Sequence, residues 1–171
     1  MGYYSEVGVA MFKEDFEQLL EETKEQTSPN DRDTYHSLTE YCDHYYIDEW
    51  QDWVFDKKDE KMIRKYVGPV KTIVILHWNW IKSGAMGIQR IFDTVRQKGG
   101  CFGRVGEETG DIEFEQYDPP GLEGYGVEWY EYLEPQAYVQ IEGGKEQIDN
   151  YEDFTKAMRQ NEVKKISAGR R

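Results

Sequence analysis

KTIVILHWNW, residues 71–80, is the stretch that decides the fold class of this chain. Eight of these ten residues are β-branched, aliphatic or aromatic when His77 is counted as aromatic, and no charge falls between Thr72 and Trp80. The run is too short to span a membrane and too continuous for a strand with one wet face. It predicts a central β-strand that is covered on both faces.

The segments around this stretch alternate between strand and helix patterns. Residues 3–12 predict a buried first strand, and apolar residues recur at helical spacing from Lys13 onward. Ser28 and Pro29 suit the cap and first turn of a second helix, which we expect to reach about Tyr46. Further elements are expected as a helix from Ser83 to Lys98 and a hairpin of two strands, 101–105 and 111–117.

The remaining segments are less regular. Residues 47–70 are compatible with a short helix, an edge strand or a covering loop, and their last part resembles a helical turn closed by Gly68 and Pro69. Beyond Asp118 we expect a strand pair, 127–133 and 136–142, and a last helix that carries Tyr151, Phe154 and Met158.

The expected order is therefore β-α-α-β-α-β-β followed by β-β-α. We interpret it as one α+β (mixed α/β) domain, with a mixed β-sheet on which the helices pack. Strand–helix–strand passages favour right-handed crossovers and parallel neighbours. Residues 1–118 would form the core α/β unit, 119–163 a C-terminal β-β-α extension, and 164–171 a frayed basic tail.

The net charge of −13 excludes ordinary nucleic-acid binding by the whole surface, because phosphates would be repelled. It suits a protein with a basic partner, although acidity also simply aids solubility. The charge is segregated along the chain: residues 1–60 carry −12, 61–105 carry +8, 106–153 carry −14 and 154–171 carry +5. These blocks could neutralise one another or leave two acidic faces beside a basic one.

The two cysteines, Cys42 and Cys101, are too few for a disulfide framework. The N-terminus MGYYSEVG lacks the basic start and apolar run of a signal peptide, so we expect a cytoplasmic protein with free thiols and no membrane partner. No phosphate-binding loop, nucleophile elbow or calcium loop is present, so no cofactor and no catalytic residue are assigned.

Acidic and aromatic residues alternate in the second half of the chain. On a strand, Asp111, Glu113 and Glu115 would share one face, which is either a solvated edge or a docking face for a basic surface. The aromatic residues beyond them could anchor an interface or simply roof the sheet. The predicted interaction residues are Glu107, Glu108, Asp111, Glu113, Glu115, Glu128, Trp129, Tyr130, Glu131 and Tyr132.

His77 and Asn79 provide an alternative site near the end of the central strand. A core histidine whose nitrogens are bonded to a neighbour is the simpler interpretation of His77. The other is a base that lines a cleft at the carboxyl end of the strand, where open α/β sheets place ligands. Cys42, His44, His77 and Cys101 lack the close ligand pairs of a zinc site, so no metal is assigned.

Several short motifs resemble small phage-encoded proteins of unassigned function. They are Tyr4-Ser5-Glu6-Val7, the run from His77 to Lys82, and the pair Arg104-Val105-Gly106-Glu107 and Asp111-Ile112-Glu113. The resemblance covers roughly residues 3–117 and provides no catalytic residues. It implies a phage accessory protein that acts in the bacterial cytoplasm.

Three functions follow as hypotheses. The first is a non-enzymatic binding protein whose acidic, aromatic surface occupies a basic site on a host protein, such as a defence or nucleic-acid-handling protein. The second is a small enzyme or nucleotide or ligand sensor with a site at the end of strand 71–80. The third is a homo-oligomeric assembly protein in which the basic block 61–105 contacts an acidic face of another copy.

Overall fold

The computed structural model describes residues 4–42, 44–82, 87–106 and 111–133, and it has an α+β fold, as predicted. The first half comprises β1 (Tyr4–Phe12), α1 (Lys13–Thr23), α2 (Pro29–Thr39), β2 (His44–Lys58) and β3 (Lys61–Lys82). The second half comprises α3 (Ile88–Lys98), β4 (Gly100–Gly106), β5 (Ile112–Tyr117) and the 3-10 turn η1 (Trp129–Glu131).

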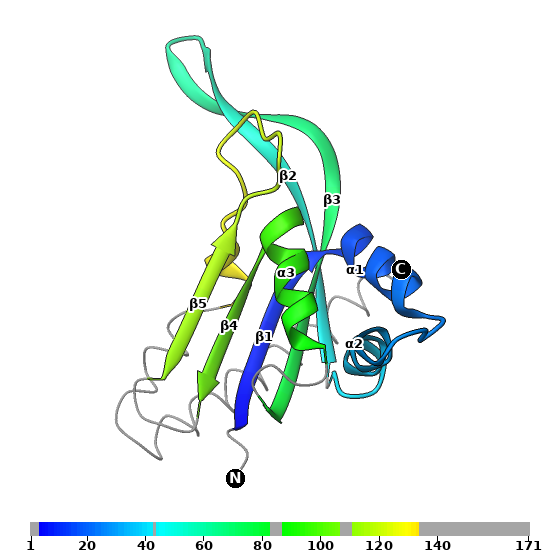
Figure 1. Ribbon diagram of the computed structural model, residues 1–171. Helices are drawn as coiled ribbons and strands as arrows, with labels where there is room; N and C mark the ends of the chain where they lie inside the picture. Colours follow the sequence, from blue (N-terminus) through cyan, green and yellow to red (C-terminus); the bar gives the residue numbers. More distant parts are fainter. Residues whose placement is uncertain (1–3, 43, 83–86, 107–110, 134–171) are drawn as a thin grey trace, which may run out of the picture.

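The five strands form one sheet in the order β2-β3-β1-β4-β5, and the three helices lie on one of its faces (Figure 1). All four strand pairings are antiparallel. The expectation of parallel neighbours was therefore wrong. In the sequence, helices α1 and α2 do come between β1 and its neighbour β3. The strand β2, which follows the helices, reverses the chain once more, so that β3 is antiparallel to β1.

The stretch that decided the fold class is the inner half of β3, and it is covered on both faces as predicted. Val74, Leu76 and Trp78 lie in the core beneath the helices. Ile73 and Ile75 lie in a second core on the opposite face. Burial on both faces explains why this stretch is apolar without alternation.

The helices are fixed to the sheet by apolar packing and by buried polar contacts. In α3 the apolar residues recur at helical spacing as predicted, and Phe92 stacks on Phe102 of β4 with ring centroids 3.9 Å apart. The indole of Trp78 donates a hydrogen bond to the carbonyl oxygen of Ser37 in α2, at 2.7 Å. Ser28 caps α2, since its hydroxyl accepts from the backbone N–H of Asp31.

The second face of the sheet is covered by the chain that follows β5. Val127, Trp129 and Leu133 pack there against Phe12 of β1. A strand was expected for 127–133, but the chain forms η1 instead. The turn places Trp129 and Leu133 on one side of the segment, so that both side chains reach the core.

Residues 47–70 form most of a long hairpin, β2–β3, whose far end extends beyond the rest of the sheet (Figure 1). The two-residue turn is Asp59-Glu60, and both residues have positive φ, as hairpin turns of this length require. The helical turn expected before Gly68 was wrong, and α2 ends at Thr39 rather than near Tyr46. The sequence of the hairpin lacks a clear alternation of apolar and polar residues, because this part of the ribbon has no third strand beside it and much of it is exposed.

The segments expected at 136–142 and 151–158, the hairpin residues 107–110 and the basic tail lie outside the described residues. So do Ser83 and Gly84, where the third helix was expected to begin. Within the described part, the strand pair β4–β5 forms with the predicted bounds to within one residue.

Arg90 of α3 joins the three helices through carboxylates. Its guanidinium pairs with Asp31 of α2 and lies 3.5 Å from a carboxylate oxygen of Glu22 in α1. Hydrogen bonds from Arg90 and then Thr27 hold the pKa of Asp31 below its ordinary value of 3.8. The carboxylate form of Asp31 therefore stabilises the fold.

We predict that Asp31→Asn destabilises the protein at neutral pH, and that the difference from wild type disappears in acid. The contribution of a carboxyl group with a lowered pKa is fully present above the unfolded value, 3.8, and is lost as the pH falls through the folded value. Urea unfolding of both proteins at intervals between about pH 7 and 2 checks this. A constant difference across the whole range would contradict it.

Candidate interaction surfaces

The acidic strand β5 is neutralised on its inner side by arginines of β4 and α3. Arg104 lies directly opposite Glu113 in the β4–β5 ladder. Its guanidinium donates to both carboxylate oxygens of Asp111, at 2.8 and 3.0 Å, and to one of Glu113, at 3.3 Å. It also donates to the hydroxyl of Ser5 in β1. Arg104 thus connects three strands.

Arg96 plays the same part for Glu115. It donates to the Glu115 carboxylate at 3.0 Å, and its guanidinium lies 5.1 Å from the centroid of the Phe102 ring. Asp111, Glu113 and Glu115 therefore lie on one face, as predicted, but each already has a cation of the same chain. Glu107 and Glu108 lie outside the described residues.

The chain from Asp118 to Leu133, which we call the acidic loop, has no internal cation. It contains four acidic and no basic residues. Its apolar residues point inward: Trp129 is 1% exposed, so its side chain lies in the core and not at the surface where a partner would bind. Tyr132 is partly buried beside it. The outward-facing residues are Glu123, Tyr125, Glu128, Tyr130 and Glu131, all of them exposed.

Glu128 and Glu131 are held close together across η1. Contact with the carboxyl group of Glu128 raises the pKa of Glu131, and partial burial adds to the effect. Arg64 of β3 opposes the rise and Asp48 of β2 adds to it, so this group lies beside the β2–β3 hairpin. The hydrogen bond with Glu128 is the largest cause of the raised pKa, and charge repulsion between the two carboxyl groups adds to it after burial.

Asp52 of β2 fixes the acidic loop to the hairpin. Its buried carboxylate accepts hydrogen bonds from the backbone N–H groups of Gly124, at 2.8 Å, and Gly126, at 3.3 Å. The N–H of Tyr125 donates to the carbonyl oxygen of Trp53. A side chain at Gly124 would place its Cβ 2.1 Å from that oxygen, so only glycine permits this approach.

An aromatic cluster continues the surface from the loop onto the hairpin. Tyr125 stacks on Trp53 with centroids 4.6 Å apart, and Phe55 packs edge-on against both rings. The guanidinium of Arg64 lies 4.3 Å from the Trp53 ring centroid, on the cluster. Tyr125 and Phe55 nevertheless keep about half or more of their surface exposed.

At the alternative site near the end of the central strand, only His77 has a described side chain. His77 is buried on the same face as Ile73 and Ile75, as predicted, and its Nε2 lies 3.9 Å from a carboxylate oxygen of Glu6 in β1. Nothing is described of the Asn79 side chain. Because β3 is antiparallel to both neighbours, its end is not the switch point at which open parallel sheets bind ligands.

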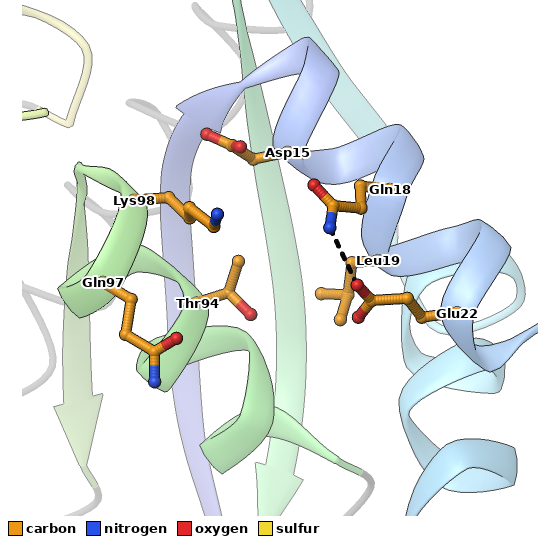
Figure 2. Close-up of a pocket in the computed structure, with 7 residues that line it drawn as sticks. All are labelled: Asp15, Gln18, Leu19, Glu22, Thr94, Gln97 and Lys98. Carbon is orange, nitrogen blue, oxygen red and sulfur yellow. Dashed lines mark hydrogen bonds between the residues drawn. The ribbon is translucent and has the colours of Figure 1, made fainter. Parts of the chain in front are cut away.

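A small hollow lies between α1 and α3 (Figure 2), and its volume is about 100 Å³. It is far smaller than the several hundred Å³ of typical ligand sites. In Figure 2 one wall is α1 and the other is α3, and Lys98 points across toward Asp15. Burial, and then Glu14, raises the pKa of Asp15. The lining residues are Asp15, Gln18, Leu19, Glu22, Thr94, Gln97 and Lys98.

Both cysteines are free thiols. Cys101 is buried in the second core, where desolvation strongly raises the pKa of its thiol and keeps it protonated. Among the residues that the structure describes, no group of three or more His, Cys, Asp or Glu side chains is arranged to hold a metal ion.

Two residues that position these surfaces were not singled out from the sequence. Asp52 lies in an acidic stretch where nothing distinguishes it from its neighbours. Arg104 could have been found, because it is the basic residue of strand 101–105, which was expected to pair with the acidic strand 111–117. Opposite charges at facing positions are a common cross-strand pair.

Comparisons of the chain with protein-family models, with curated proteins and with solved structures find no match. No helix in the described part of the chain is long and apolar enough to cross a membrane.

We predict that Arg104→Gln destabilises the fold by roughly 1–3 kcal/mol, because charge-assisted bonds to two carboxylates are lost and Asp111 and Glu113 then repel each other. Urea unfolding measures the loss. In the double variant Arg104→Gln/Glu113→Gln, most of the repulsion is removed and part of the stability should return. No recovery in the double variant would contradict this account of the acidic strand.

We predict that Asp52→Ala costs roughly 1–3 kcal/mol of unfolding free energy, because three backbone N–H groups lose a carboxylate acceptor. Stacking of Tyr125 on Trp53 should weaken as well, and the near-ultraviolet circular dichroism of these rings should change. Asp56→Ala, at an exposed position of the same strand, serves as the control and should cost less than about 0.5 kcal/mol. Equal effects of the two substitutions would contradict the role of Asp52.

Proposed function

We propose that this chain is a non-enzymatic binding protein, of the phage accessory type, whose acidic loop occupies a basic site on a host protein. A host defence protein or nucleic-acid-handling protein provides such a site, because it must attract phosphate. The binding surface consists of the exposed residues of the acidic loop, namely Glu123, Tyr125, Glu128, Tyr130 and Glu131, together with Phe55 of the hairpin.

The observation that carries the proposal is the carboxylate pair Glu128 and Glu131. These two carboxyl groups are in contact at an exposed site, and their hydrogen bond first, then burial and charge repulsion, raise the pKa of Glu131. A lysine or arginine from a partner would relieve this repulsion and gain two charge-assisted contacts. The paired acids of β5 would gain much less, since Arg96 and Arg104 already neutralise them.

Aromatic side chains supply the apolar part of the same surface. Tyr130 is 50% exposed beside the carboxylate pair, and Tyr125 is held by its stacking on Trp53. Tyrosine buries a large area at small entropic cost, which is why it is frequent among interface hot spots. Acids would speed the encounter with a basic partner and the rings would slow its release.

The loop is also held in shape before any partner arrives. Trp129 and Leu133 anchor it in the second core, and Asp52 fixes its Gly124–Gly126 segment. A surface that is already ordered loses less conformational entropy on binding. These features support recognition by a fixed surface.

Capture from a host lysate on the immobilised protein, followed by mass spectrometry, tests the proposal. We expect one predominant partner with a basic surface, whose capture falls steeply as salt rises from about 50 to 500 mM. Glu128→Gln/Glu131→Gln should flatten this salt dependence. Tyr130→Ala should weaken binding by roughly 30-fold, the effect of losing a hot spot of about 2 kcal/mol.

Asp56→Asn/Asp59→Asn is the matched control, because it removes the same charge from exposed positions outside the acidic loop. It should leave capture unchanged. Capture that is insensitive to salt, or reduced equally by the control, would argue against the proposed surface.

A further inference from the structure

We propose that the far end of the β2–β3 hairpin is a docking arm for a second copy of this chain, and that it binds the acidic outer face of α1 and α2. The arm comprises Trp53–Val67. The arm shares Trp53 and Phe55 with the aromatic cluster that contacts Tyr125 of the acidic loop, whereas its basic tip, Lys57–Lys61, lies outside the surface proposed above for a host partner.

Beyond Trp53 and Phe55, which pack with Tyr125 of the acidic loop, the arm lacks the support that the rest of the sheet has. Strand β1 pairs with β3 only from Ile73 to Lys82, so within the described residues the arm is a ribbon of two strands without a third (Figure 1). Isolated two-stranded ribbons are marginally stable in water. A ribbon that binds another surface is stabilised by that contact.

The arm also exposes apolar side chains at high density. Met62 is 62% exposed and Tyr66 is similar, and Phe55 and Ile63 are only about half covered. These four account for half of the large exposed hydrophobic residues that the structure describes. Exposed apolar residues gathered on one projecting element indicate a binding surface.

The charge of the arm defines the chemistry of its partner. It contains five basic and three acidic residues, whereas the whole chain carries −13. At the tip, Lys57, Lys58 and Lys61 are exposed. The fitting partner is therefore an acidic surface that also offers apolar contact.

The outer face of α1 and α2 on this same chain has these properties. Residues 13–40 contain nine acidic and three basic residues. On α1, Glu17 and Glu21 follow each other at one helical turn, and their side chains are 61% and 77% exposed. Their own partners, Lys13 and Lys24, form only solvent-exposed pairs, which contribute little and exchange readily. Tyr41, 46% exposed, follows α2 in the chain and is an aromatic residue available for contact.

The dimensions of the two elements are compatible. Seven residues of an extended strand cover about 23 Å, and the eleven residues of α1 about 16 Å. The ribbon is thus long enough to lie along α1. Two copies that each place an arm on the other make the contact twice, which closes the assembly at two chains.

A nucleic acid is the other acidic polymer that a basic, aromatic ribbon could contact. The arm carries a charge of only about +2, and the remainder of the chain would repel phosphates strongly. A second copy is favoured because it supplies a negative face together with an aromatic residue.

The test uses a pair of complementary charge reversals in the full chain. Lys57→Glu/Lys61→Glu gives a protein whose arm and helical face are both negative. Glu17→Lys/Glu21→Lys gives a protein whose arm stays positive and whose α1 surface gains positive charge. Each variant alone places like charges in the contact, whereas a mixture of the two restores opposite charges in both contacts of the dimer.

Sedimentation or light scattering over about 1–100 µM measures the mass at low salt. We expect wild type to approach twice the chain mass of 20.2 kDa, each variant alone to dissociate at least about tenfold more readily, and their mixture to recover a two-chain species. Circular dichroism confirms that each variant is folded.

A wild-type protein of single-chain mass throughout this range overturns the proposal, and so does a mixture that gains nothing over its components. Capture of a single-stranded oligonucleotide by a monomeric wild type, lost in Lys57→Glu/Lys61→Glu, would overturn it in favour of nucleic acid. Glu128→Lys/Glu131→Lys, a reversal on the acidic loop, should leave self-association unchanged. Host capture and self-association can therefore fail separately.

Discussion

The need to bury both faces of the two central strands governs the rest of this structure. β1 and β3 are apolar on both sides, so one face requires the helices and the other requires a second cover. The described part of that cover is the acidic loop, which contributes Val127, Trp129 and Leu133 to the core. Because these residues face the core, Glu128, Tyr130 and Glu131 face outward, whereas Tyr132 is partly buried. The proposed binding surface is thus the outer side of a structural element.

The charge blocks of the sequence are divided between structure and surface. Arg90, Arg96 and Arg104 all belong to the basic block, and each pairs with an acid from an acidic block. This accounts for the neutralised side of β5 and for the joined helices. The acids of the acidic loop and the outer residues of α1 have no buried cation in the described structure. Partial cancellation therefore leaves two acidic surfaces, one on each side of the sheet.

Much of the fold could be predicted from the sequence, because its strongest patterns have local causes. The continuous apolar run of β3, the spacing of Ile88, Ile91, Phe92 and Val95, and the cap at Ser28 each reflect a structure that its own residues favour. For the β2–β3 arm an edge strand was only one of three alternatives, since a ribbon that is largely exposed has no buried side to impose alternation. Strand direction was also missed, because it depends on the inserted strand β2. The acids were found, but their arginine partners depend on register, which composition does not reveal.

The arm and the acidic surfaces carry opposite charges, so they would bind different partners. A protein of net charge −13 repels its own copies at distance, so its self-association requires a local surface of the opposite sign. The described structure provides such a surface on the arm, with apolar side chains beside the lysines. The negative charge of the acidic loop attracts basic proteins and repels the acidic surfaces of other copies. In the proposed dimer, contact between copies would involve the arm and the outer face of α1 and α2, which would leave the carboxylates of the acidic loop for a basic partner.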